Sequence, residues 1–189
     1  QQNARMILSS LSSGWAGLSE AERAGWNALA SQVPFTDIFG DVQHLSGQVM
    51  YVKLNANLIK IAEAPNSTAP VMESIPPMLL DGLDAEQTAG GLVTLDASFV
   101  QQTVPAGYQI VIYATPPIKP GISFVKNQYR MIGAIDTITS GVANALTLWN
   151  DRFGAVTAGQ KIFLRAALVN ETTGQQGIPS QAEAVIDTA

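Results

Sequence analysis

The amino-acid sequence predicts an α+β chain in which a helical region of two to three helices precedes an antiparallel β-sandwich. Apolar residues recur every three or four positions over residues 1–64, which is typical of amphipathic helices, whereas short β-type runs fill residues 78–189. Prolines cluster between these parts, in residues 65–77, where each removes a backbone donor and favours an extended conformation before it. We therefore expect a helical docking region (1–64), a proline-rich linker (65–77) and a sandwich (78–189).

The clearest helix start in the first region is at Ser19. Ser19 and Glu22 have the spacing of a capping box, in which each side chain bonds to the backbone N–H of the other residue. The helix that they begin is expected to run to about Gln32, because Pro34 cannot continue it.

Two further helices are expected on either side of this one. Residues 4–11 predict an earlier helix, which the Ser-Ser-Gly run at 12–14 should weaken. Ser46 can cap a third helix over about residues 47–62, whose apolar positions recur at helical spacing: Tyr51, Leu54, Leu58 and Ile61. The run at 49–52 could instead open a strand, since β-branched and aromatic residues favour strands.

The remainder of the chain predicts strands separated by turns rich in glycine, proline and asparagine. The expected strands cover residues 92–99, 108–113, 130–135, 145–149, 162–169 and 182–186. Many strands without a helical pattern between them indicate an antiparallel sandwich.

The composition excludes several classes of function. The 189 residues include no cysteine and a single histidine, His44, so there is no cysteine nucleophile, disulfide framework or multi-histidine metal centre. The net charge of −5 argues against nucleic acid as a partner, and no run of about 18 apolar residues predicts a membrane span. Charged residues make up 13%, about half of the usual ~25%, as expected where surface is buried in interfaces.

Two polar groupings are candidate sites. His44 lies between Asp41 and Ser46, but a catalytic triad needs its three members held in register, and here all three lie in one short loop. Ser46 is better used as a helix cap, which favours an ordinary loop histidine. Asp81, Asp84 and Glu86 offer three carboxylates, fewer than the roughly six to eight oxygens that calcium takes, and predict an acidic surface turn. We expect no enzyme, no catalytic residue, no metal site and no cofactor.

The end of the chain resembles a fibronectin type III domain. Residues 158–170 are similar to the penultimate strand of that fold, and residues 174–188 to its last turn and strand. On this strand Ile162, Leu164, Ala166 and Leu168 should point inwards. Ile162 stands where the family has a tyrosine, and Phe99 is expected to fill the place of its early tryptophan. The resemblance implies an immunoglobulin-like β-sandwich.

A second resemblance covers residues 15–58. Trp15-x-x-Leu18-Ser19-x-x-Glu22-Arg23-x-x-Trp26 is followed by Thr36-Asp37-x-Phe39-Gly40 and by Leu45-Ser46-Gly47-x-x-x-Tyr51-x-x-x-Asn55-x-x-Leu58. This combination is similar to a family of small uncharacterised proteins of tailed phages and prophages. The resemblance implies a virion structural component and supplies no catalytic residues.

The sequence thus predicts a phage virion structural protein, a capsid-decoration or head- or tail-associated component. Its expected partners are other virion proteins and copies of itself, held by multivalent packing. A helical region of ~60 residues buries too little surface to be stable alone. We therefore expect it to pack against the sandwich or against a neighbouring subunit. The expected packing or docking anchors are Trp15, Leu18, Trp26, Phe39, Tyr51 and Leu58.

Three alternatives stay open at the level of sequence, the least favoured being an enzyme whose activity would be lost on His44→Ala or on a change of Asp81 or Asp84. A carbohydrate-binding or adhesin module, extracellular or on a cell surface, would bind a host glycan through Tyr108, Tyr129 and Trp149. An extracellular filament subunit would polymerise without any shell.

Overall fold

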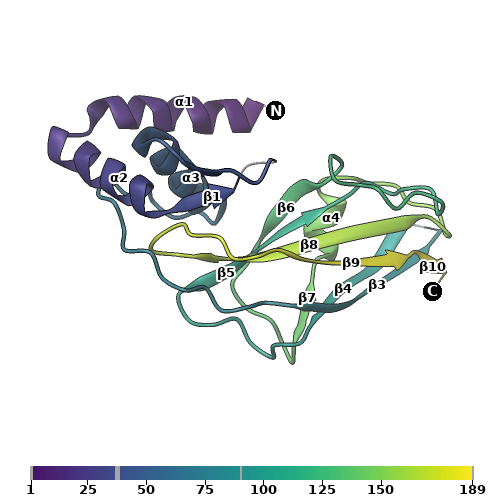
Figure 1. Cartoon of the computed structure of the whole chain (residues 1–189). Coiled ribbons are helices and arrows are strands. Elements are labelled where there is room, and N and C mark those ends of the chain that lie inside the picture. Colours follow the sequence, from purple (N-terminus) through teal and green to yellow (C-terminus); the bar gives the residue numbers. More distant parts are fainter. Residues whose placement is uncertain (1, 37–38, 90, 189) are drawn as a thin grey trace. The chain divides into compact units, whose positions relative to one another are not determined.

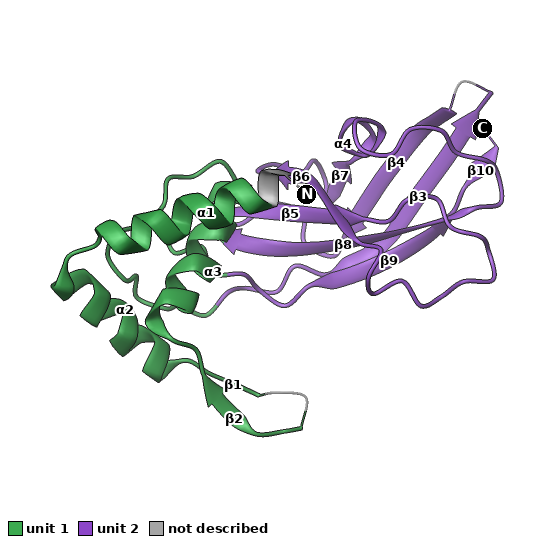
Figure 2. Cartoon of the chain, turned by 90° about the horizontal axis from the view of Figure 1, so that it is seen from above, with its two compact units in different colours: residues 1–74, 170–175 green, residues 75–169, 176–189 purple. Residues whose placement is uncertain are grey.

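The computed structural model describes residues 2–36, 39–89 and 91–188, and it has an α+β fold made of two compact units (Figures 1 and 2). The helical unit comprises residues 1–74 and 170–175, and the two-sheet unit comprises residues 75–169 and 176–189. The proline-rich segment expected to be a linker is divided between them, with residues 65–74 in the helical unit and residues 75–77 in the two-sheet unit.

The helical unit contains three helices and a short hairpin among its described residues. The helices are α1 (Gln2–Gly17), α2 (Glu20–Gln32) and α3 (Gly47–Lys60). Between α2 and α3, β1 (Pro34–Thr36) and β2 (Val42–His44) pair in antiparallel register, a hairpin that the sequence did not predict.

Both predicted helix caps are confirmed. The Ser19 hydroxyl accepts from the Glu22 backbone N–H at 3.3 Å, and the Glu22 carboxylate accepts from the Ser19 backbone N–H at 2.8 Å. The Ser46 hydroxyl accepts from the Val49 backbone N–H at 3.3 Å and begins α3, so the alternative strand at residues 49–52 is wrong.

Helix α1 is longer than the sequence predicted. It continues through residues 12–14 because Gly14 lies against α3, where a Cβ would stand 2.7 Å from the Tyr51 hydroxyl oxygen. A glycine that weakens an isolated helix here permits close approach of two helices.

The two-sheet unit is built from two four-stranded sheets with the orders β10-β3-β4-β7 and β6-β5-β8-β9. Its elements are β3 (Leu80–Thr88), β4 (Gly91–Phe99), β5 (Tyr108–Ala114), β6 (Arg130–Ile135), β7 (Val142–Asn144), α4 (Leu146–Asn150), β8 (Lys161–Asn170), β9 (Ser180–Val185) and β10 (Asp187–Thr188). The described pairs β3–β4, β4–β7, β5–β6 and β8–β9 are antiparallel, whereas β10 runs parallel to β3.

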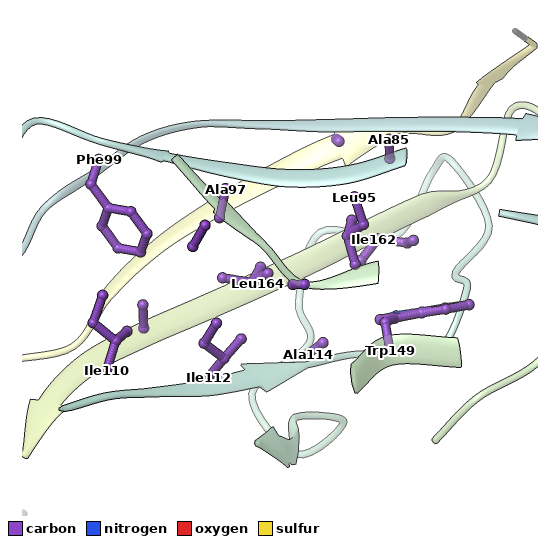
Figure 3. Close-up of a cluster of buried hydrophobic side chains, with 14 of the residues drawn as sticks. Ala85, Leu95, Ala97, Phe99, Ile110, Ile112, Ala114, Trp149, Ile162 and Leu164 are labelled. Carbon is purple, nitrogen blue, oxygen red and sulfur yellow. The ribbon is translucent and has the colours of Figure 1, made fainter. Parts of the chain in front are cut away.

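The core of this unit lies between the inner faces of the two sheets, as Figure 3 shows. The four β8 residues predicted to point inwards are confirmed as buried, each at most 1% exposed: Ile162, Leu164, Ala166 and Leu168. Side chains of β3 and β4 meet them from the other sheet, among them Ala85, Leu95, Ala97 and Phe99.

Two sequence predictions in this unit are wrong. The expected strand at 145–149 is a helix instead: β7 ends at Asn144, whose Oδ1 accepts from the Leu146 backbone N–H at 3.2 Å, and α4 follows. The expected acidic turn at Asp81–Glu86 is part of strand β3, in which buried Ala85 alternates with the exposed Asp84. Pairing with β4 across the full strand outweighs the poor strand propensity of aspartate and glycine.

Candidate interaction surfaces

An aromatic cluster holds the three helices of the helical unit together. Trp26 is fully buried, and its ring stands edge-on to Tyr51, with centroids 5.3 Å apart and planes at 88°. Trp15 contacts the same tyrosine, with ring centroids 5.6 Å apart. Burial raises the pKa of the Tyr51 hydroxyl, and the nearby Glu22 charge adds to the effect. These three predicted anchors are bound within their own unit.

The other predicted anchors divide into two groups. Leu18 is half-buried against the aromatic cluster, and Leu58 is buried. Phe39, in contrast, is 84% exposed. Asp37, which belongs to the same sequence motif as Phe39, lies outside the described residues.

We use the name hairpin arm for β1, β2 and the described connecting residues 39–41, which extend away from the helices of their unit in Figure 2. All six strand residues are exposed, including the large apolar Phe35 and Val42. Phe35 stands opposite Gln43 and Val42 stands opposite Thr36, so these two apolar side chains lie on opposite faces of the hairpin. Phe39 lies in the connection between the two strands.

A segment that the sequence did not single out completes the helical unit. This segment, which we call the completing loop (residues 170–175), begins at the last residue of β8 and belongs to the helical unit. The Gly174 carbonyl oxygen accepts from Asn57 Nδ2 at 3.0 Å, and the Thr172 carbonyl oxygen accepts from Asn66 Nδ2 at 2.6 Å. No local pattern could have predicted these bonds, because they join residues more than a hundred positions apart.

The expected linker residues are also bonded within this unit. The Ser67 carbonyl oxygen accepts from Trp26 Nε1 at 2.7 Å. The fully buried Asn55 side chain donates to the Asn66 carbonyl oxygen at 3.1 Å and accepts from its backbone N–H at 2.6 Å. Residues 66 and 67 therefore satisfy the buried polar groups of α2 and α3.

The three aromatics proposed as ligand-facing have different surroundings. Trp149 is fully buried and donates from Nε1 to the Thr115 carbonyl oxygen at 3.2 Å, so it belongs to the core and not to a ligand-facing surface. Tyr108 is half-buried against the same core. One face of the Tyr129 ring is occupied by the Arg165 guanidinium, 4.3 Å from the centroid, and burial raises the pKa of the Tyr129 hydroxyl.

The remaining polar candidates do not form a reactive group in this structure. His44 is exposed on β2, with Nδ1 3.4 Å from the Ala30 carbonyl oxygen, and Ser46 is occupied as a helix cap. Over the described residues, histidine, aspartate and glutamate side chains nowhere gather in a group of three that could hold a metal ion. None of the described helices has the length and apolar character needed to cross a membrane.

No protein-family model matches the chain, and no curated protein matches it. The resemblance to tailed-phage proteins therefore stays a prediction that rests on the motif of residues 15–58.

Proposed function

We propose that the chain is a structural component of a tailed-phage virion, acting by protein–protein packing without a catalytic step. Its partners are other virion proteins, and the hairpin arm is the element that docks on them. The motif of residues 15–58 supports this assignment, and the hairpin arm lies within that motif.

The observation that carries the proposal is the exposure of the hairpin arm. Phe39, Val42 and Phe35 are 84%, 66% and 41% exposed. Three large exposed apolar side chains on one short element favour an interaction site, because each gains roughly 1.5–3 kcal/mol when it is removed from water.

The backbone of the hairpin arm supports the same role. Among the described strands, β1 and β2 pair only with each other, so the outer edge of each lacks a neighbouring strand. A two-stranded hairpin is marginally stable in water, and a third strand from a partner would extend it. Addition of a strand supplies main-chain hydrogen bonds, while the exposed side chains give specificity.

The charge on the arm indicates the chemistry of the partner surface. Its described residues carry one carboxylate, Asp41, one histidine, His44, and no lysine or arginine. An apolar groove beside an exposed strand edge fits such an element, whereas a strongly charged surface does not. Repeated copies on a symmetric particle would add avidity to a weak single contact.

Within this assignment, we propose that the two-sheet unit is a fibronectin type III-like sandwich. The first, second and fifth of its main strands, β3, β4 and β7, share one sheet. The third, fourth, sixth and seventh, β5, β6, β8 and β9, share the other. In an immunoglobulin constant domain the fourth strand joins the first sheet instead, so the order here argues for the fibronectin-like variant of the sandwich.

The test is incorporation into particles. A phage that carries the gene is deleted for it and complemented with the wild-type chain, with Phe39→Ser, or with Val71→Ser as a control at another residue that is 80% exposed. Mass spectrometry of density-purified particles should find the wild-type and Val71→Ser chains at a fixed ratio to the major capsid protein and should find Phe39→Ser depleted. Absence of the wild-type chain from purified particles would overturn the virion assignment, and equal incorporation of Phe39→Ser would overturn the role of the hairpin arm.

A further inference from the structure

The two sheets of the two-sheet unit differ in charge. The strands β10, β3, β4 and β7 contain no lysine or arginine, and they carry five carboxylates: Asp81, Asp84, Glu86, Asp96 and Asp187. The other sheet and the loop before β6 carry most of the positive charge of this unit: Lys119, Lys126, Arg130, Lys161 and Arg165. One chain thus presents both an acidic and a basic region.

Four of the carboxylates share the outer face of their sheet. Asp84 stands directly opposite Asp96 across β3 and β4, and Asp187 is in register with Glu86 across β10 and β3. Like charges directly opposite one another destabilise a sheet. In the described part of the chain no lysine or arginine lies within ion-pair distance of these four side chains, so an incoming cation would relieve the repulsion.

A hollow lies beside β7 and the end of β6, and of the four carboxylates only Asp96 lines it. The hollow has a volume of about 570 Å³, and its lining combines apolar side chains with carboxylates and an amide: Ile138, Val142, Leu148, Asp96, Asp136 and Asn144. That volume is within the range of roughly 300–1,000 Å³ at which pockets hold ligands or side chains. The hollow is therefore suited to an apolar side chain that has a positively charged side chain next to it.

The same chain provides such a group in the loop before β6. Phe124 is 77% exposed and Ile122 is 41% exposed, and both lie between Lys119 and Lys126. Neighbouring Val125 is buried against Ile118 and Phe163, so the base of the loop is fixed on its sheet while Phe124 points to solvent.

We propose that copies of this chain associate head to tail, with Phe124 of one copy entering the hollow beside β7 of the next. Lys126 then faces Asp96 and Asp136, and the apolar lining of the hollow receives the aromatic ring. A second copy is favoured as the occupant because both complementary surfaces belong to one chain. The contact is heterologous, and repetition of such a contact gives rings or filaments. It does not rest on the virion assignment or on the hairpin arm.

The first test is sedimentation of the full-length chain over a range of concentrations. Wild type should associate as concentration rises, and association should weaken when salt is raised from about 0.1 M to about 1 M, which shortens the Debye length about threefold. Phe124→Ala should weaken association about tenfold or more, as loss of a central aromatic anchor does. The matched control is Ile178→Ala, because Ile178 is 91% exposed in the same unit and lies outside both surfaces.

Charge reversal identifies the two surfaces. Lys126→Glu and Asp136→Lys should each be monomeric alone, since each places like charges at the contact. An equimolar mixture should associate again, because the reversed loop meets the reversed hollow and each wild-type surface meets the other. A wild-type chain that stays monomeric at all concentrations, including one that binds anionic lipid vesicles instead, would overturn the proposal. Association that is unaffected by Phe124→Ala, or a mixture that stays monomeric, would also overturn it.

Discussion

Asn57 Nδ2 donates a 3.0 Å hydrogen bond to the carbonyl oxygen of Gly174, a residue 117 positions further along the chain. Both groups are buried in the helical unit. Gln175 adds a reciprocal pair, because its Oε1 accepts from the Glu73 backbone N–H at 3.1 Å and its Nε2 donates to the Glu73 carbonyl oxygen at 2.7 Å. The helical unit is therefore complete only when residues 170–175 are in place.

The first prediction concerns the close approach of Gly174 to α3. Gly174 has a φ of 69°, and a Cβ built on it would collide with the Leu54 carbonyl group. We expect Gly174→Ala to lower the free energy of unfolding by about 3 kcal/mol or more, because backbone strain and a clash with main-chain atoms act together. Urea denaturation followed by far-UV circular dichroism measures this loss.

Gly159→Ala is the matched control for this substitution. Gly159 has a φ of 80°, but its Cβ position is open. The control variant bears the left-handed backbone cost alone, about 1–2 kcal/mol. Equal losses for the two variants would show that contact with α3 contributes nothing at Gly174.

The second prediction is that residues 1–64 do not fold in isolation. This fragment lacks Ser67, whose carbonyl accepts from Trp26, and Asn66, which makes two hydrogen bonds with Asn55. Both Trp26 and Asn55 are fully buried, and each buried polar group left unpaired costs about 1–3 kcal/mol. We expect aggregation or a spectrum of disordered chain. A soluble monomer with cooperative thermal unfolding would contradict this prediction, and the fragment 1–74 mixed with a peptide of residues 169–176 is the comparison that restores the missing partners.

The sequence predicted the features that depend on residues close together in the chain, and it missed those that depend on contacts between distant residues. The caps at Ser19 and Ser46 were predictable because donor and acceptor lie three residues apart. The continuation of α1 past Gly14 was not, because it depends on Tyr51 in another helix. The same holds for α4, whose N-cap Ala145 makes no side-chain hydrogen bond and whose Trp149 is buried in the core.

The candidate interaction residues were predictable as a class but not one by one. Trp26 and Phe39 belong to the same aromatic-rich motif, and composition alone gave them the same role. The structure buries Trp26 because α2 packs against α3, and it leaves Phe39 exposed in the connection between β1 and β2. Burial is a property of the assembled helices, and the sequence pattern of one element does not contain it.

The third prediction is a pH dependence at the N-terminus of α2. Hydrogen bonds from the side chain and backbone of Ser19 hold the pKa of Glu22 below its ordinary value of 4.5. Because the folded-state pKa is the lower one, the stabilisation is fully present above the unfolded-state pKa and is lost as pH falls through the folded-state pKa.

Denaturation midpoints of wild type and Glu22→Gln between neutral and acidic pH measure this dependence. Wild type should be the more stable of the two above about pH 5, and the difference should shrink below the unfolded-state pKa of Glu22. Glu20→Gln is the matched control, since Glu20 lies in the same helical turn and is not part of the capping box. A difference between wild type and Glu22→Gln that is constant over the whole range would contradict this cause.

The fourth prediction separates a core aromatic from a surface aromatic in the helical unit. Trp26→Ala should lower the free energy of unfolding by about 3–5 kcal/mol, because it empties the space between α2 and α3 and removes the donor to Ser67. Trp26→Phe should cost less, since a phenyl ring keeps part of the aromatic volume although the indole N–H is lost. Phe39→Ala should change stability by no more than about 0.5 kcal/mol, because that side chain contributes little burial. Denaturation of the three variants measures these differences, and a loss at Phe39 comparable to that at Trp26 would contradict the assignment of Phe39 to the surface.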